Sequence, residues 1–419
     1  MIRFHTLRDW IIKELNVKQR IQIICFWYVL SLMMISRKHS LEFAAEVSGS
    51  DKSQFSRFLK DHFNIAVLTL TDLSKRRAKE YSKALEKLKS LPWKVAFIID
   101  LTGQGRSSRH SDNVQKHNHG NGYFVGHQWT NIILLINDMI IPLPPIAFYS
   151  KKYCRENGME YKSEHLRVIE YLQSLELWAC IQEYHPEDVV VLADSGYDDH
   201  RIEKAVMERG WDFIIPLKIK RSVKSNPEYL KTKHNEGWKQ VKEFFKAHRW
   251  LKWETVRLFT SGEKRRRKEF RIRHTIGWLK KVGPVQLVCS EKKKAARGER
   301  KYFACSHLTV KPRQILVGYG LRWTIELFHK AVKMHLGFED VSTKSFDSVI
   351  AHVHWVYCAY ILLHSELPGI SSSAETLSER QRYVMSILVK KEKANLLQQL
   401  TQIGGVVKQK NELKRALAA

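Results

Sequence analysis

Hydrophobic and polar residues alternate with helical spacing over residues 1–90, and short apolar runs replace this pattern from Trp93 onward. A helical domain is therefore predicted for residues 1–90. Within it, the apolar run from Ile21 to Ile35 is too short to span a membrane comfortably and predicts a buried helix. A second run of this kind, from Val349 to Leu363, predicts another buried helix.

The segment from His39 to Phe63 has the pattern of a helix, a short glycine-containing turn and a second helix. Ser50 or Asp51 would cap the second helix, since short polar side chains accept backbone hydrogen bonds at that position. The polar residues that this helix would expose are Lys52, Ser53, Gln54, Ser56, Arg57 and Lys60. Such a pair fits a DNA-binding helix-turn-helix, in which Lys52, Gln54 and Arg57 would contact DNA. Helical hairpins also occur as plain structure, so both interpretations stay open.

Two apolar runs with strand character each lead to an aspartate. The run WKVAFIID begins at Trp93 and ends on Asp100, and the run DVVVLAD delivers Asp194. Acids near the carboxyl ends of strands in α/β sheets commonly face ligands. Four other acids are weaker alternatives for the same role: Asp112, Asp138, Asp198 and Asp199.

The elements predicted between residues 91 and 216 follow a definite order. They are strands at 93–100, 129–137 and 139–143, a helix at 163–184, a strand at 189–192, a helix from Asp198 or Asp199 to Arg209, and a strand at 211–217. A tight turn at Asn137-Asp138 would join the second and third strands as a hairpin. This is the order of an RNase H-like mixed sheet, which places Asp100 on the first strand beside Asp194 on the fourth.

Residues 217–309 change to alternating short runs, which predict a mostly antiparallel, β-rich insertion. Two strongly basic stretches lie in it, at Lys264–Lys268 and Glu291–Lys301. In so cationic a chain, phosphate contacts are favoured over mere solvation for these stretches.

The polar stretch 107–126 predicts a loop near the site. Its neighbourhood holds His117, His119 and His127, which we interpret as residues of a solvated loop rather than as metal ligands. Six cysteines are scattered without a C-x-x-C pair, and no His/Cys finger spacing occurs. The sequence therefore predicts reduced thiols and no zinc site.

The stretch YGLRWTIELFHKAVKMHLG, residues 319–337, is predicted to form one two-faced helix. An arc of roughly 80° would gather Tyr319, Arg322, Trp323, Glu326, Lys330 and Lys333. The other side would bury Leu321, Ile325, Leu327, Phe328, Ala331 and Val332. Cations suit phosphate and a carboxylate suits a metal, although solvated helices also use i,i+4 ion pairs of this kind for modest stability.

The chain has 419 residues and a formal charge of +28, which indicates a polyanionic partner, nucleic acid above all. A membrane surface or a ribosome would also fit this charge. The domains predicted are a helical DNA-binding domain at 1–90, a first core part at 91–216, the β-rich insertion at 217–309, a second core part at 310–367 and a helical tail at 368–419. The fold class is α/β with helical regions at both ends.

The spacing of Tyr319, Arg322, Glu326 and Lys333 resembles the Y-R-E-K signature of the insertion-sequence-four family of bacterial transposases. The two aspartate motifs, WKVAFIID and ADSGYDD, occur upstream in the order that this family has, so the resemblance covers about Trp93 to Phe338. It implies an RNase H-like core in which three acids form a catalytic and metal-binding DDE triad: Asp100, Asp194 and Glu326.

The resemblance also implies contacts to the transposon-end strand, for which Tyr319, Arg322 and Lys333 of the signature are the candidates. Trp323 and Lys330, which share the accessible face of the same helix, are further candidates for DNA contact. It implies that an aromatic residue of the insertion stacks on an extruded base. The candidates, among which the sequence does not choose, are Trp238, Trp250, Trp253 and Trp278.

Three carboxylates without His or Cys partners favour two hard ions, Mg²⁺ or Mn²⁺. The expected function is that of a transposase that binds terminal inverted repeats, cleaves the ends and joins them to target DNA. We expect it to act as a homodimer, in the bacterial cytoplasm at the nucleoid and away from membranes. The alternatives are an RNase H-like metal-dependent DNA nuclease without joining activity, and a catalytically silent DNA-binding repressor.

Overall fold

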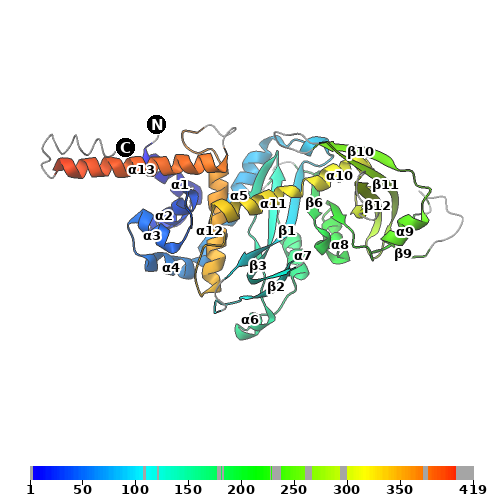
Figure 1. The fold of residues 1–419 in the computed structure, drawn as a ribbon, viewed down its shortest axis with the longest axis horizontal. Coiled ribbons are helices and arrows are strands. Elements are labelled where there is room, and N and C mark those ends of the chain that lie inside the picture. The colour runs from blue at the N-terminus through cyan, green and yellow to red at the C-terminus, as the bar shows by residue number, and fades with distance from the viewer. Residues whose placement is uncertain are drawn as a thin grey trace. The chain divides into compact units, whose positions relative to one another are not determined.

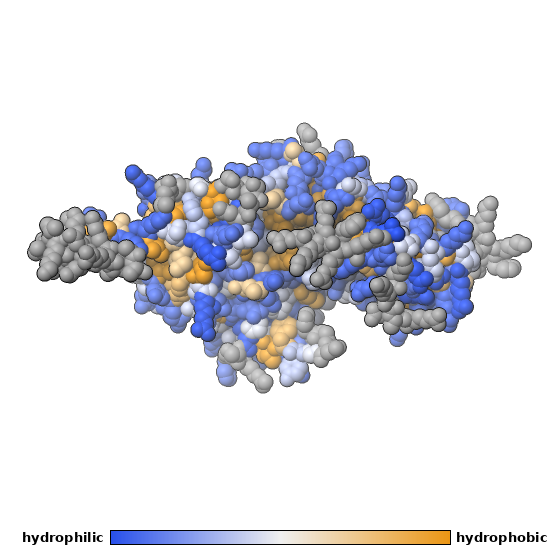
Figure 2. All heavy atoms as spheres, turned by 45° about the horizontal axis from the view of Figure 1, so that its top comes forward, coloured by the Kyte–Doolittle hydropathy of each residue, from blue (hydrophilic) through white to orange (hydrophobic). Residues whose placement is uncertain are grey.

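The computed structural model describes residues 3–106, 110–119, 122–176, 181, 184–226, 228, 237–259, 267–292, 300–370 and 376–402. The chain is a mixed α/β protein with one large sheet and helices towards both ends of the sequence (Figure 1). It divides into two compact units, of which the first comprises Met1–Leu73, Gly105–Val114 and His329–Ala419 and the second Ser74–Gln104 and Gln115–Phe328. Hydrophilic side chains cover much of the surface that Figure 2 presents.

The second unit is built on a mixed sheet, which has 13 strands in the described part of the chain. The strands of its first half are β1 Val95–Gly105, β2 Gln115–His119, β3 Gly122–Ile136, β4 Met139–Pro142, β5 Ile146–Ala147, β6 Val189–Ala193 and β7 Asp212–Pro216. Here β4, β3, β1, β6 and β7 lie side by side in that order, and β6 is parallel to both β1 and β7. This order is consistent with an RNase H-like domain, and the predicted neighbourhood of the first and fourth strands is confirmed.

The hairpin between β3 and β4 forms where the sequence predicts it. Asn137 and Asp138 both have positive φ angles, 48° and 62°, as the tightest hairpin turn requires. The Asn137 side chain donates hydrogen bonds to the carbonyl oxygens of Tyr81 and Ala84, which ties this turn to the preceding helix end.

Helices α6 Lys151–Glu156, α7 Glu164–Ser174 and α8 His200–Glu208 belong to the same unit. Ser163 caps α7 and Asp199 caps α8, each by accepting a hydrogen bond from a backbone N–H in the first turn. The C-terminal part of the helix predicted at 163–184 falls partly on residues outside the described ones. The apolar faces of α7 and α8 pack into the core beside β1, β6 and β7.

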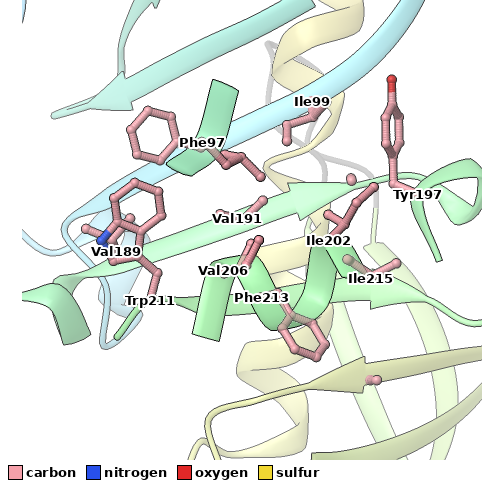
Figure 3. Packing of buried hydrophobic residues seen from close by; sticks show 14 of the residues in the cluster. Phe97, Ile99, Val189, Val191, Tyr197, Ile202, Val206, Trp211, Phe213 and Ile215 are labelled. Atoms are coloured by element: carbon pink, nitrogen blue, oxygen red, sulfur yellow. The ribbon is translucent and has the colours of Figure 1, made fainter. Parts of the chain in front are cut away.

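One hydrophobic core lies on the face of the sheet against which α7 and α8 pack (Figure 3). Alternate residues of each strand enter it, because successive side chains of a strand point to opposite faces. Its strand residues include Phe97, Ile99, Val189, Val191, Phe213 and Ile215, and helix α8 adds Ile202 and Val206. The strand neighbours of these residues therefore face the other side of the sheet.

The strands predicted for the insertion continue the same sheet. They are β8 Ser222–Ser225, β9 Lys239–Gln240, β10 Glu254–Phe259, β11 Arg267–Leu279, β12 Gly283–Lys292 and β13 Arg300–Cys305, with helix α9 Val241–Ala247 among them. Their mutual pairings are antiparallel, as predicted, and β13 joins them to β7. A hydrogen-bonded path therefore runs from β6 through β7, β13 and β12 to β11.

Helices α10 Pro312–Gly320 and α11 Trp323–His335 follow the sheet. Short 3₁₀ turns occur at Gln19–Ile21, Ser82–Ala84, Leu88–Ser90, Pro186–Asp188 and Ser195–Tyr197. Helix α11 begins in the second unit and its last turns belong to the first.

The first unit is helical. Its helices are α1 Phe4–Leu15, α2 Gln22–Met33, α3 Leu41–Ser48, α4 Lys52–Asp61, the first part of α5 Phe63–Tyr81, α12 Phe346–His364 and α13 Leu377–Gln402. The two predicted buried helices are confirmed as α2 and α12, and α12 packs against α1, α2, α4 and α13. Within the described chain, α12 is also the one helix long and apolar enough to cross a membrane, and 94% of that stretch is buried inside the protein.

Candidate active site

Asp100 and Asp194 lie at equivalent positions of two neighbouring parallel strands. The pairing of β1 with β6 ends with Ile99 opposite Ala193, so these aspartates are the next residues on each strand. Neighbouring strands lie about 4.8 Å apart, and both aspartates follow core residues, so both point to the opposite face of the sheet. The sequence predicted that the first strand ends at Asp100, and this is wrong. Strand β1 runs on to Gly105, because β3 still flanks its other edge.

Asp194 also shapes the turn that follows it. Its Oδ1 accepts a hydrogen bond of 2.8 Å from the backbone N–H of Gly196 and so caps the turn Ser195–Tyr197. A Cβ atom on Gly196 would lie only 2.8 Å from that same oxygen. The absence of a side chain at residue 196 is therefore what allows the Asp194 carboxylate to keep this position.

The predicted single helix over 319–337 is wrong in one respect, because two helices meet there. Helix α10 ends at Gly320 and α11 begins at Trp323. Between them, Arg322 N–H bonds to Tyr319 O and Ile325 N–H to Arg322 O, three residues back, which is a tighter turn than that of an α-helix. Gly320, a weak helix former, lies at this break.

Two close contacts hold α10 on the sheet. A Cβ on Gly318 would lie 2.8 Å from Cδ1 of Ile214 on β7, so the glycine permits the close approach of helix and strand. The Tyr319 ring packs against Phe303 of β13, with ring centroids 4.9 Å apart. Since Ile214 and Phe303 face away from the core of Figure 3, α10 lies on the aspartate side of the sheet.

Arg322 connects two of the three candidate acids. Its Nη1 lies 3.2 Å from Oδ2 of Asp100, and its Nη2 donates a hydrogen bond to Oε1 of Glu326. The side chains of Arg322, Asp100 and Glu326 are 16%, 17% and 32% exposed, so the group is partly shielded from water. The guanidinium also lies 5.8 Å from the Tyr319 ring centroid.

The electrostatics of Asp100 tie the three acids together. Burial raises the pKa of Asp100 to about 6; Arg322 opposes the rise, and the charges of Asp194 and Glu326 add to it. Burial also raises the pKa of Tyr319, against the influence of Arg322 and with that of Asp194 and Asp100. The structure therefore brings Asp100, Asp194, Glu326, Arg322 and Tyr319 into one neighbourhood.

The outer face of α11 carries the remaining candidates. Trp323 is 60% exposed and Lys330 is exposed, while Lys333 forms an ion pair of 3.0 Å with Glu339. The prediction that Leu327 is buried is wrong. Leu327 is 53% exposed, because it lies one helical turn after Trp323 on the same face of α11. The buried stripe is narrower than predicted and consists of Leu321, Ile325, Phe328 and Val332.

The helix-turn-helix pattern is confirmed as local structure. Gly49, with φ 68°, ends α3, and the Asp51 side chain caps α4 by accepting a 2.7 Å hydrogen bond from the Ser53 N–H. The predicted outward residues of α4 are all exposed: Lys52, Ser53, Gln54, Ser56, Arg57 and Lys60. Their contact with DNA stays a prediction.

The weaker alternatives to the two aspartates have other partners. Asp198 is buried and accepts a 2.7 Å hydrogen bond from the Lys218 N–H, and Asp199 caps α8 and pairs with Arg201. Asp138 occupies the hairpin turn, and Asp112 belongs to the other compact unit.

The polar stretch predicted as a loop is wrong over part of its length. Residues 115–119 and 122–126 form the paired strands β2 and β3, and residues 107–109 and 120–121 lie outside the described ones. His117 and His127 are buried in this ribbon, and His117 stacks on Phe124 with ring centroids 5.0 Å apart. The ribbon lacks the apolar alternation by which a strand is found in sequence.

Sequence reasoning missed a buried charged cluster beside the Asp194 turn. Arg221 contacts both Glu203, which is fully buried, and Asp198, whose Oδ1 lies 3.4 Å from the Arg221 Nε. Burial raises the pKa of Glu203 to about 8; Arg221 opposes this and Asp198 adds to it. The available signal was a glutamate next to the apolar positions Ile202 and Val206 of α8.

Among the described residues, no three acidic, histidine or cysteine side chains are arranged so that together they could already hold a metal ion. For the candidate acids, the contacts of Arg322 explain why such an arrangement is missing, since the guanidinium binds oxygen atoms of Asp100 and Glu326. The chemistry of the candidate donors, the three carboxylates of Asp100, Asp194 and Glu326, suits Mg²⁺ or Mn²⁺.

Residues 175–362 match the family model described as Transposase DDE domain. The matched region holds Asp194, Arg322 and Glu326, whereas Asp100 lies upstream of it. No curated protein matches the chain. Over these residues the chain is similar to the DDE domain of transposases, and this match supports a DDE transposase.

Proposed function

We propose that the protein is a transposase of the insertion-sequence-four type, which binds the terminal inverted repeats of its element, cleaves the DNA ends and joins them to a target. The observation that carries this proposal is that Arg322 contacts both Asp100 and Glu326, while Asp194 follows the strand paired with that of Asp100, so that the charges of Asp194 and Glu326 both act on Asp100. Strands β1 and β6 supply two of the acids and α11 the third, in a region that overlaps the transposase match.

Asp100, Asp194 and Glu326 would hold the divalent ions. Three carboxylates with one guanidinium leave an excess of negative charge, and burial raises the pKa of Asp100, so a divalent cation would relieve both. Two such ions supply activation of a hydroxyl nucleophile and stabilisation of the leaving oxygen during displacement at phosphorus. Once Arg322 releases the carboxylates, it can hold a DNA phosphate beside them.

Several surfaces of the protein would bind DNA. On α11 they are the ring of Trp323 and the amines of Lys330 and Lys333, and near the end of α10 the hydroxyl of Tyr319. The β10–β11 and β12–β13 strand pairs extend past the end of the sheet at which β6 and β7 stop. In the sequence, the two basic stretches fall between β10 and β11 and between β12 and β13, largely on residues outside the described ones. Helix α4, with Lys52, Gln54 and Arg57, would read the repeats in the major groove.

The candidate residues for stacking on an extruded base differ in accessibility. Trp238, Trp250 and Trp278 are 47%, 59% and 41% exposed. Trp253 is half-buried and already contacts three arginines. The three exposed tryptophans are therefore better candidates than Trp253.

We also propose that the synaptic complex is a homodimer that holds two DNA ends.

A cleavage assay tests the proposal. Full-length protein is incubated with Mg²⁺ and a plasmid that carries the repeats flanking the gene, and the DNA products are separated. Joined products are expected; nicked or linear products without joining would indicate a nuclease, and intact DNA with specific binding a repressor.

Matched variants test the assignment of the acids. Asp100→Asn, Asp194→Asn and Glu326→Gln should each abolish cleavage while repeat binding, measured by fluorescence anisotropy, stays within about threefold of wild type. Glu208→Gln, an exposed acid on α8, serves as the control. Cleavage that persists in any of the three active-site variants would remove that residue from the triad.

A further inference from the structure

We propose that Arg271, Arg273 and Arg300, gathered around Trp253, form a binding site for the phosphates of a duplex DNA segment other than the one at the acids. This inference rests on the proposed DNA-processing function and extends it to the face of the insertion opposite the three carboxylates. It is carried by the arrangement of the arginines, their excess charge and their place in the sheet.

The cluster is built by strand register. Arg271 of β11 lies opposite Glu291 of β12, which lies opposite Arg300 of β13, so these three form one cross-strand row. Arg273 lies two residues from Arg271 on the same face of β11. The Trp253 ring, just before β10, contacts all three arginines, with guanidinium carbons 4.1 Å (Arg273), 5.2 Å (Arg271) and 5.5 Å (Arg300) from the ring centroid.

The charges within the cluster do not balance. Glu291 pairs with both Arg271 and Arg300, the latter at 3.0 Å. Arg273 is only 4% exposed; its Nη1 donates a hydrogen bond of 3.5 Å to the carbonyl oxygen of His248, and its Nε has no hydrogen-bond partner within the described residues. In the described part of the chain, these three guanidinium groups share the one carboxylate of Glu291, and a buried cation without an anionic partner is costly. A phosphate at the cluster would supply the missing negative charge.

The arginines can also reach such a phosphate. The side chains of Arg271 and Arg300 are 47% and 37% exposed, whereas Glu291 beneath them is 13% exposed. The Trp253 ring attracts all three guanidinium groups, whose central carbons lie within 5.5 Å of its centroid. A planar guanidinium group can donate a pair of hydrogen bonds to the oxygens of one phosphate. Two exposed arginines at the ends of one cross-strand row, Arg271 and Arg300, suit the repeated phosphates of a nucleic-acid backbone better than a single small anion.

The place of the cluster in the sheet separates it from the acids. Cys289 and Tyr302 lie in the core on the face opposite Asp194, and Glu291 and Arg300 lie two residues further along the same strands. By the alternation of strand side chains, the cluster continues that opposite face. It also lies towards the end of the sheet where β6 and β7 have their C-terminal residues, beyond the pairing of Phe303 with Pro216. DNA bound there would be a second segment, such as the target or the flank of an end.

Two variants with opposite expected effects test the site. Affinity of the full-length protein for a duplex carrying the repeat, and for one of random sequence, is measured by fluorescence anisotropy over a series of salt concentrations. Arg271→Gln with Arg300→Gln should weaken binding to both duplexes and reduce the salt slope by about 2, since each phosphate contact contributes about 0.9. The control removes the same charge elsewhere, with Lys152→Gln and Arg155→Gln on the exposed surface of α6.

Glu291→Gln should tighten binding at low salt by about threefold or more, because it frees two arginines for phosphate. Arginines that served the sheet alone would show no such gain. A loss of affinity and a fall in the salt slope no greater than those of the α6 control would overturn this inference. Unchanged or weaker binding by Glu291→Gln would overturn it as well. Wild-type protein that binds neither duplex would instead overturn the proposed function, so the two failures are distinct.

Discussion

Arg322 holds Asp100 in an ion pair, with 3.2 Å between Nη1 of the arginine and Oδ2 of the aspartate. The same guanidinium bonds to Glu326. In the free protein, therefore, a side-chain cation occupies oxygen atoms that we assign to divalent ions. Arg322 and a divalent ion at the proposed site would compete for these oxygens, and a DNA phosphate that draws Arg322 away would favour metal binding.

Replacement of Arg322 tests this competition. Arg322→Gln should raise the Mn²⁺ affinity of the DNA-free protein by about tenfold, since the carboxylates lose their internal cation. Titration followed by electron paramagnetic resonance of free Mn²⁺ measures the change, with Arg313→Gln on the exposed face of α10 as control. An affinity equal to that of wild type would show that the guanidinium does not limit metal binding.

Gly196→Ala tests the position of Asp194. The added Cβ would lie 2.8 Å from Oδ1 of Asp194 and should displace the carboxylate, so cleavage should fall by about tenfold or more while the melting temperature changes little. Gly237→Ala, where a Cβ meets open space, is the matched control. Equal activities of the two variants would separate the Asp194 position from catalysis.

Glu203 should make the stability of the protein depend on pH. Its pKa is raised from the ordinary 4.5 to about 8, chiefly by burial, so the folded state favours the protonated acid. The associated stability is complete below pH 4.5 and is lost as pH rises through about 8. Glu203→Gln should flatten the unfolding free energy between pH 4.5 and about 8 relative to wild type, whereas exposed Glu208→Gln on the same helix should not. Parallel curves for wild type and Glu203→Gln would contradict this assignment.

Helix α4 should contribute to DNA binding through its outer face. Arg57→Ala should weaken repeat binding and lower its salt slope by about 1, and Gln54→Ala should reduce the preference for the repeat over random DNA. Anisotropy measurements with both duplexes separate these effects, and Lys13→Ala, exposed in the last turn of α1, is the control. Arg57→Ala with unchanged affinity would leave the helix pair as plain structure.

The sequence predicted those parts of the fold that depend on local patterns. Buried strands appear as continuous apolar runs, so β1 and β6 and the aspartates that they carry could be found, and the Asn137-Asp138 turn follows from the conformations these residues tolerate. The break at Gly320–Arg322 and the exposure of Leu327 depend on how α10 and α11 pack against the sheet. The Arg322 bridge joins residues 222 positions apart and depends on tertiary structure. Glu203 was missed because its partner Arg221 lies on a different element.

The uninterrupted ladder from β6 to β11 has a mechanical consequence. Interstrand hydrogen bonds resist shear, so the hairpins of the insertion cannot swing independently of the strand that presents Asp194. A duplex gripped far out on those hairpins would be held at a set offset from the scissile bond. Lengthening β10 and β11 by equal numbers of residues would then shift the position of cleavage along the DNA.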